Sequence, residues 1–233
     1  MYVLITGANR GLGRCLTQLA VEEGHTVLAT VRGGMQRAGE LSALMEAYPQ
    51  LLIVLDADVR DEQTVSAAAE AAMQAVPWLD CIINNAGMFA GREFTVETMD
   101  MAVMESIVDV NLLGPFRVMK HFLGMLSRSK TSSIINISSE AGSLTNAYAG
   151  DYAYAISKAG LNMFSEQLNR LLGKEGVRVY SVHPGWMKTD MGGEKAPLEP
   201  MESAKGIWQM AVGRIVPVGP HVYLDYTGKP MEI

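Results

Sequence analysis

The sequence has very few cysteines. Only Cys15 and Cys81 occur among its 233 residues, and neither belongs to a CxxC pair or to another spacing typical of metal ligands. The four histidines lack such a spacing too, so we expect no metal site. Both cysteines are expected to be small buried apolar residues, and nothing in their placement indicates an oxidising compartment.

Long hydrophobic runs are also missing. No apolar run approaches the roughly 18 residues that a membrane-spanning helix needs, and Met1 is followed almost at once by a strand-like segment instead of a leader. The formal net charge is −6, so the chain has no basic excess with which to neutralise phosphates. We therefore expect a cytoplasmic protein that binds neither membranes nor nucleic acid.

Apolar residues make up 48% of the chain, in short runs that alternate with longer helical patterns. Expected strands are Tyr2–Ile5, Thr26–Val31, Leu51–Leu55, Leu79–Ile83, Ser133–Ile137, Val177–Val182 and Val222–Asp225. Expected helices are Gly11–Glu23, Met35–Tyr48, Glu62–Val76, Thr98–Ser127 with a kink near Gly114-Pro115, Tyr152–Gly173 and Glu202–Gly213.

This alternation predicts an α/β fold, because parallel neighbouring strands need long crossover connections and are buried on both faces. We expect residues 1–233 to form a single-domain, Rossmann-like, doubly wound parallel sheet of about seven strands, with helices on both faces. Within it, residues 186–213 are expected to form a substrate loop and a short helix.

A glycine-rich turn from Thr6 to Gly13 follows the first expected strand and opens the first expected helix. Its spacing, G-x3-G-x-G, allows a tight turn and lets a pyrophosphate approach the backbone, beside the free N–H groups of the helix N-terminus. In this position the turn predicts a dinucleotide site. The residues expected to contact the cofactor here are Gly7, Asn9, Arg10, Gly11, Leu12 and Gly13.

Two arginines mark the expected adenosine end of that site. Arg32 stands just past the second expected strand, where a carboxylate would favour NAD by binding the ribose 2′-hydroxyl and an arginine accommodates the 2′-phosphate. Arg10 lies within the glycine-rich turn. The two arginines are either ordinary solvated charges or they converge on one phosphate. Since no acidic residue occupies the region, we predict that the cofactor is NADP(H).

Tyr154 and Lys158 are one turn apart on an expected helix, so they share a face. A neighbouring ammonium lowers the pKa of a tyrosine from about 10 toward the working range, and such a tyrosine can pass a proton to a carbonyl oxygen. Alone, the spacing also fits a core tyrosine and a surface lysine. It gains weight because polar and glycine residues end three other strands, at the sheet edge where ligands bind: Asn84–Gly87, Ser138–Ser139 and His183–Gly185.

Together these motifs resemble the short-chain dehydrogenase/reductase family over nearly the whole chain. The matching positions are Thr6–Gly13, Asp58-Val59, Asn84–Gly87, Asn111, Ser139, Tyr154-x3-Lys158 and Pro184-Gly185. His183–Gly193 and Leu224–Pro230 further resemble the C-factor and Sniffer-type carbonyl reductases. The interval from Ser139 to Tyr154 is longer than the family pattern, which leaves Ser138 open as a substitute for Ser139. Tyr152 is a weaker candidate than Tyr154, because it lacks a lysine four residues later.

The resemblance implies a catalytic set of four residues. Tyr154 would be the general acid and base, and Lys158 would lower its pKa and hold the nicotinamide ribose. Ser139 would hydrogen-bond the substrate oxygen, and Asn111 would hold a water that joins Lys158 to a proton relay. The other implied cofactor contacts are Asp58, Val59, Asn85, Ala86, Gly87, Pro184, Gly185, Met187 and Thr189.

The implied activity is the reversible, NADPH-dependent reduction of an aldehyde, ketone or quinone to an alcohol. The alternative is an NADP-binding signalling or regulatory protein with little or no catalysis, which would not need all four residues of the catalytic set. The family analogy also implies a homodimer or homotetramer built on the helices Thr98–Ser127 and Tyr152–Gly173. Within the second helix, small or flexible residues suit a close contact: Ala159, Gly160 and Met163.

Overall fold

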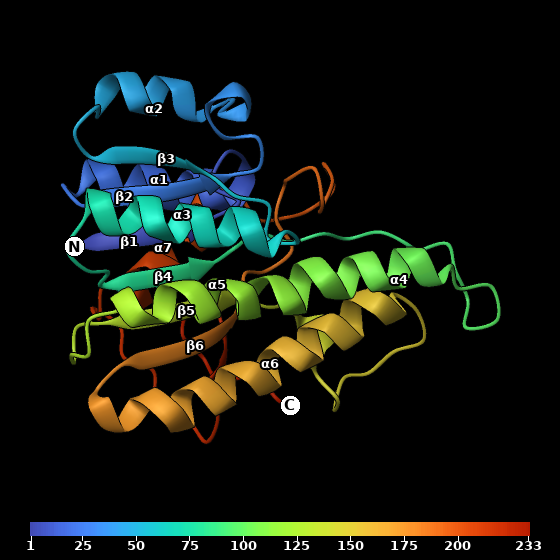
Figure 1. The fold of residues 1–233 in the computed structure, drawn as a ribbon. Coiled ribbons are helices and arrows are strands. Elements are labelled where there is room, and N and C mark those ends of the chain that lie inside the picture. The colour runs from blue at the N-terminus through green and yellow to red at the C-terminus, as the bar shows by residue number, and fades with distance from the viewer.

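The computed structural model describes all 233 residues, and its strands form one parallel sheet of seven strands (Figure 1). The strands are β1 Tyr2–Thr6, β2 Thr26–Val31, β3 Leu52–Asp56, β4 Cys81–Asn84, β5 Ser133–Ile137, β6 Arg178–His183 and β7 Tyr223–Asp225. Their order is β3-β2-β1-β4-β5-β6-β7. The expected doubly wound parallel sheet is confirmed, and its order reverses between β1 and β4, where ligands bind in such sheets.

Helices cover both faces of the sheet. They are α1 Gly11–Glu22, α2 Leu41–Ala47, α3 Glu62–Ala75, α4 Met101–Val108, α5 Gly114–Phe122, α6 Tyr152–Leu172 and α7 Pro200–Ala211. Side chains of α1, α2 and α7 pack on one face, and those of α3, α5 and α6 on the other. The strands alternate between these two cores: Val3 and Ile5 face α1, and Leu4 faces the opposite layer. Burial on both faces explains why the strands are continuous apolar runs.

The expected helix over Met35–Tyr48 is wrong in its first half. Gly34–Arg37 forms a 3₁₀ turn, and α2 begins only at Leu41. The cause is a set of glycines with left-handed backbone, which interrupt a helix: Gly33 (φ +83°), Gly34 (φ +56°) and Gly39 (φ +56°). The turn folds back on itself, because a Cβ placed on Gly33 would lie 3.0 Å from Cδ of Arg37.

The expected long helix over Thr98–Ser127 is divided. A π-helical turn, Asp109–Leu113, separates α4 from α5, just before the expected kink. Pro115 has no N–H with which to continue the α-helical ladder, so the turn ahead of it widens. The π turn directs Asn111 into the interior, where it is fully buried.

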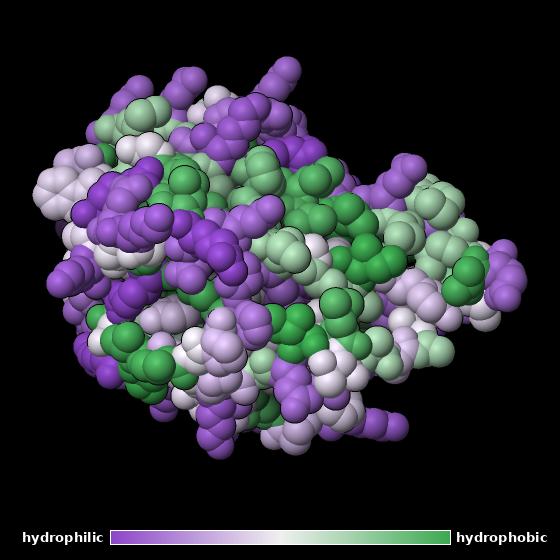
Figure 2. Space-filling view, turned by 90° about the horizontal axis from the view of Figure 1, so that it is seen from below, coloured by the Kyte–Doolittle hydropathy of each residue, from purple (hydrophilic) through white to green (hydrophobic).

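Gly160 does not lie on a free helix face. A Cβ at this position would lie 2.8 Å from Cδ2 of Leu112, so Gly160 lets α6 pack closely against the π turn of its own chain. Met163 remains 62% exposed. The helix α6 borders the lower side of the sheet in Figure 1, and the view from that side in Figure 2 shows apolar groups gathered near the middle of the face.

No helix is both long enough and apolar enough to cross a bilayer.

Candidate active site

The glycine-rich turn is tied to the end of β4. Asn85 donates from Nδ2 to the carbonyl oxygens of Thr6 (2.9 Å) and Gly7 (3.0 Å), and its own N–H donates to Oγ1 of Thr6 at 3.0 Å. Gly7 has φ +62°, and a Cβ there would lie 3.0 Å from Cα of Ala86. A Cβ on Gly13 would lie 2.3 Å from the Gly7 oxygen, so both glycines are needed for this close packing. Asn85 therefore shapes the turn, a contribution beyond the cofactor contact expected of it.

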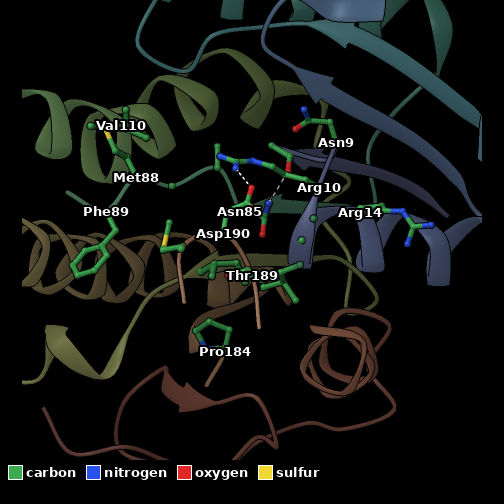
Figure 3. A pocket seen from close by; sticks show the side chains of 18 of the residues that line it. Asn9, Arg10, Arg14, Asn85, Met88, Phe89, Val110, Pro184, Thr189 and Asp190 are labelled. Carbon is green, nitrogen blue, oxygen red and sulfur yellow. Dashed lines mark hydrogen bonds and ion pairs between the residues drawn. The ribbon is translucent and has the colours of Figure 1, made fainter. Parts of the chain in front are cut away.

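The loop after β6 lies across the same turn. It closes on itself through the Lys188 N–H, which donates to the Leu198 oxygen at 2.9 Å. A Cβ on Gly11 would lie 3.4 Å from Cγ2 of Thr189, which places Thr189 directly over the turn. Asp190 forms an ion pair with Arg10, and Figure 3 shows these two residues joined at the cleft. The turn and the loop are thus linked, although they are far apart in the sequence.

A cleft of about 1000 Å³ runs along the carboxyl ends of the strands. It is lined by every expected cofactor contact except Gly185, whose φ of +82° and close approach to Leu198 give it a role in turning the chain. A volume of this size suits a cofactor. The glycine-rich turn at the N-terminus of α1 and the arginines at one end of the cleft fit a dinucleotide.

Five arginines line the cleft, and most of them are paired with carboxylates. Besides the Arg10 pair, Arg14 lies 3.0 Å from Glu40, and Arg60 lies 3.0 Å from Asp58. The two arginines that form no ion pair are Arg32 and Arg37.

Arg37 was missed from the sequence, because only the left-handed glycines of the Gly33–Gly39 stretch return it to the cleft. It is fixed through its carbonyl oxygen, which accepts from Nδ2 of Asn9 at 3.2 Å. From the sequence, Arg10 and Arg32 were expected to bind the phosphate. In the structure, the arginines of the cleft that form no ion pair are Arg32 and Arg37.

Tyr154 and Lys158 share one face of α6, and both line the cleft. Nζ of Lys158 lies 5.5 Å from the centre of the Tyr154 ring and donates to the Ile137 oxygen at 2.7 Å. Phe89 packs its ring against Tyr154 with the centres 4.8 Å apart. The three side chains place a phenol and an ammonium beside an apolar wall.

The pKa values of this pair differ from the expectation. Burial raises the pKa of Tyr154, while the nearby Ser139 hydroxyl opposes the rise. Burial also lowers the pKa of Lys158, from 10.5 to about 8. The expected lowering of the tyrosine pKa by Lys158 is therefore not seen in this structure, because desolvation of the buried phenol outweighs other effects. At neutral pH the phenol keeps its proton and the amine remains charged.

The two serines after β5 point to different places. Ser138 lines the cleft, but its buried Oγ is occupied by the hydrogen bond of 2.6 Å that it donates to Oδ1 of Asn162. Ser139 caps a short 3₁₀ turn, Glu140–Gly142, and its hydroxyl opposes the rise in the pKa of Tyr154. The geometry favours Ser139 over Ser138 as the residue that meets a substrate oxygen, and the role itself remains a prediction.

Asn111 lies behind the cleft and is held by the neighbouring chain. Its amide exchanges two hydrogen bonds of 2.8 Å with the backbone of Met88, and Nδ2 also donates to Oγ of Ser157 at 3.1 Å. A Cβ on Gly87 would lie 3.6 Å from Oδ1 of Asn111 and 3.9 Å from Nζ of Lys158, so the two residues flank one point. The water-holding role of Asn111 stays a prediction.

Comparison with known proteins agrees with this geometry. A profile of the short chain dehydrogenase family matches residues 1–199. The NADP-dependent 3-hydroxy acid dehydrogenase of Salmonella typhi is 36% identical over 190 residues, which cover 79% of this chain and 72% of that protein. An uncharacterized oxidoreductase of Schizosaccharomyces pombe is 35% identical over 192 residues, covering 82% and 75%.

Solved structures include similar carbonyl reductases. The NADPH-bound carbonyl reductase from chicken fatty liver has a TM-score of 0.89 at 30% identity, covering 100% of this chain and 98% of that one. The carbonyl reductase Sniffer of D. melanogaster has a TM-score of 0.90 at 27% identity, covering 100% and 99%. The chain belongs to the short-chain dehydrogenase/reductase family of oxidoreductases, and the resemblance stated from its sequence motifs is confirmed.

Proposed function

We propose that the protein is an NADPH-dependent carbonyl reductase that converts an aldehyde, ketone or quinone to an alcohol, reversibly. The observation that carries the proposal is the pairing of Tyr154 and Lys158, with Ser139 close to Tyr154, at one end of a cleft whose other end holds two unpaired arginines. The similar structures that contain NADPH support the cofactor. Bound NADPH supplies the hydride.

The residues of the chain would bind and orient this cofactor. The glycine-rich turn and the N-terminus of α1 receive the pyrophosphate. Arg32 and Arg37 receive the 2′-phosphate, since neither forms an ion pair with a carboxylate. Thr189 and the backbone after Pro184 hold the nicotinamide end, and Lys158 holds its ribose.

Tyr154 would donate the proton to the carbonyl oxygen of the substrate. Its raised pKa keeps the phenol protonated at neutral pH, and Lys158, still charged below a pKa of about 8, stabilises the phenolate that forms. The Ser139 hydroxyl donates to the same substrate oxygen, where negative charge develops. Phe89, Met88 and Met187 would form the apolar part of the substrate site.

A panel of aldehydes, ketones and quinones, with NADPH oxidation followed by absorbance, tests the proposal. We expect turnover by the wild type and a loss of about a thousandfold in kcat for Tyr154→Phe, with NADPH affinity unchanged. Tyr152→Phe, two residues earlier on the same helix, is the matched control and should retain full activity. NADPH binding without turnover of any carbonyl would instead favour a regulatory protein.

An assembly of two or four copies and a cytoplasmic location remain predictions. The exposed Met163 on α6 and Phe116 on α5 support a contact at this side of the molecule. Sedimentation as a monomer would contradict the predicted assembly.

A further inference from the structure

The segment Ser138–Gly142 carries the serine of the site, and side chains from three other elements hold it. It follows β5 and contains only a short 3₁₀ turn, so its own secondary structure provides little rigidity. The side chains that contact it come from α6, from β6 and from β7. None of them has a part in the mechanism described above.

Asn162 holds both ends of the segment. Its Oδ1 accepts from Oγ of Ser138 at 2.6 Å, and its Nδ2 donates to the Gly142 oxygen at 3.2 Å. The same Oδ1 accepts from Oγ of Ser181 on β6 at 2.7 Å. Gly142 lies so close that a Cβ there would be 2.9 Å from Nδ2 of Asn162 and from the backbone of Lys158. The segment is therefore docked on the helix that carries Tyr154.

Tyr223 and His183 hold the two sides of one peptide group. The hydroxyl of Tyr223, a residue only 1% exposed, donates to the Ser139 oxygen at 2.7 Å. The N–H of the same peptide group, that of Glu140, donates to Nδ1 of His183 at 3.1 Å. Burial lowers the pKa of His183, which favours the neutral ring that can accept this bond. A peptide group held on both sides cannot rotate, and its plane fixes the backbone angle that aims the Ser139 side chain.

We propose that Tyr223, His183 and Asn162 are positioning residues that aim the Ser139 hydroxyl at the substrate oxygen. The inference rests on the proposed function, because it concerns the group that receives that oxygen. A hydrogen-bond donor aids catalysis only when it is aimed beforehand at the place where charge develops. If the hydrogen bond of Tyr223 or that of His183 to this peptide group is lost, Ser139 stays in the site but its hydroxyl is no longer held in one orientation.

Tyr223→Phe is the cleanest test, because it removes one hydroxyl and keeps the buried ring. We expect kcat for carbonyl reduction to fall about tenfold, with the KM for NADPH unchanged. Tyr180→Phe is the matched control, since Tyr180 is also buried in the sheet and its hydroxyl forms no hydrogen bond with the segment. Its kcat should match that of the wild type.

The decisive measurement repeats Tyr223→Phe in a Ser139→Ala background. If Tyr223 acts through Ser139, the second substitution causes no further loss of kcat; a merely structural role would lower kcat by the same factor in both backgrounds and would overturn the inference. His183→Leu provides the same test if Tyr223→Phe does not fold, and His183→Gln should recover part of the loss because its amide oxygen can accept the Glu140 N–H.

The outcomes separate the two proposals. A folded wild type that binds NADPH and reduces no carbonyl overturns the proposed function. An active wild type in which Tyr223→Phe is fully active, or in which its loss is independent of Ser139, overturns only the positioning role.

Discussion

The buried charge of Lys158, which is expected to assist catalysis, should also lower the stability of the folded protein. The residue is 4% exposed, and its ammonium has one hydrogen-bond partner, the Ile137 oxygen. Lowering the pKa from 10.5 to about 8 corresponds to about 3 kcal/mol of folding free energy at neutral pH. Lys158→Met removes this cost, keeps a chain of similar length and loses a hydrogen bond worth about 1 kcal/mol. We therefore expect the inactive variant to be more stable than the wild type by about 2 kcal/mol at pH 7.

The size of this stability difference depends on pH in a defined window. Below a pKa of about 8 the amine is charged in both the folded and the unfolded chain, and the cost of burial is complete. Between pH 8 and 10.5 the unfolded chain binds more protons than the folded one, so the wild type gains stability as the pH rises. Above pH 10.5 both states are neutral, and the advantage of Lys158→Met vanishes.

Urea unfolding followed by circular dichroism at pH 7 and near pH 10 measures both effects. Lys205→Met, at an exposed position of α7, is the control and should change the free energy of unfolding by less than about 0.5 kcal/mol at either pH. A Lys158→Met variant that is less stable than the wild type at pH 7, with a difference that does not vary with pH, would refute the reasoning.

Two further predictions concern the cleft. Arg32→Ala and Arg37→Ala should each raise the KM for NADPH about tenfold and leave the KM for NADH unchanged, because neither arginine is held in an ion pair. Equal losses with the two cofactors in steady-state kinetics would contradict this prediction. Asp190→Asn should change the free energy of unfolding by less than about 1 kcal/mol, since both members of its pair with Arg10 are exposed, and should lower the KM for NADPH by freeing Arg10. An unchanged or higher KM would show that Asp190 and the cofactor do not compete for Arg10.

Much of the fold could be predicted because strands that are buried on both faces are continuous apolar runs, as in Tyr2–Ile5. The site motifs at strand ends were visible for the same reason, since parallel strands bring those ends to one edge. Arg37 could not be predicted, because its place depends on left-handed glycines whose effect is local and conformational.

Other features depend on contacts between distant parts of the chain. The pairing of Arg10 with Asp190 joins residues that no local pattern relates. The direction of the Tyr154 pKa was also beyond the sequence, because it follows from how completely the phenol is buried. The hydrogen bonds around Ser139 likewise need the final positions of α6, β6 and β7.

The spacing of Tyr154, Lys158 and Asn162 along α6 has a consequence for how the protein can vary. A helix fixes these three residues at intervals of about 6 Å along its axis, so they move only as one unit. Gly142 docks on that unit before the exposed stretch Leu144–Ala149, and α6 begins at Tyr152, directly after its N-cap Asp151. Length changes inside this stretch are therefore insulated from the reacting groups. The chain between the two anchor points can therefore take a longer or shorter loop while the reacting groups keep their positions.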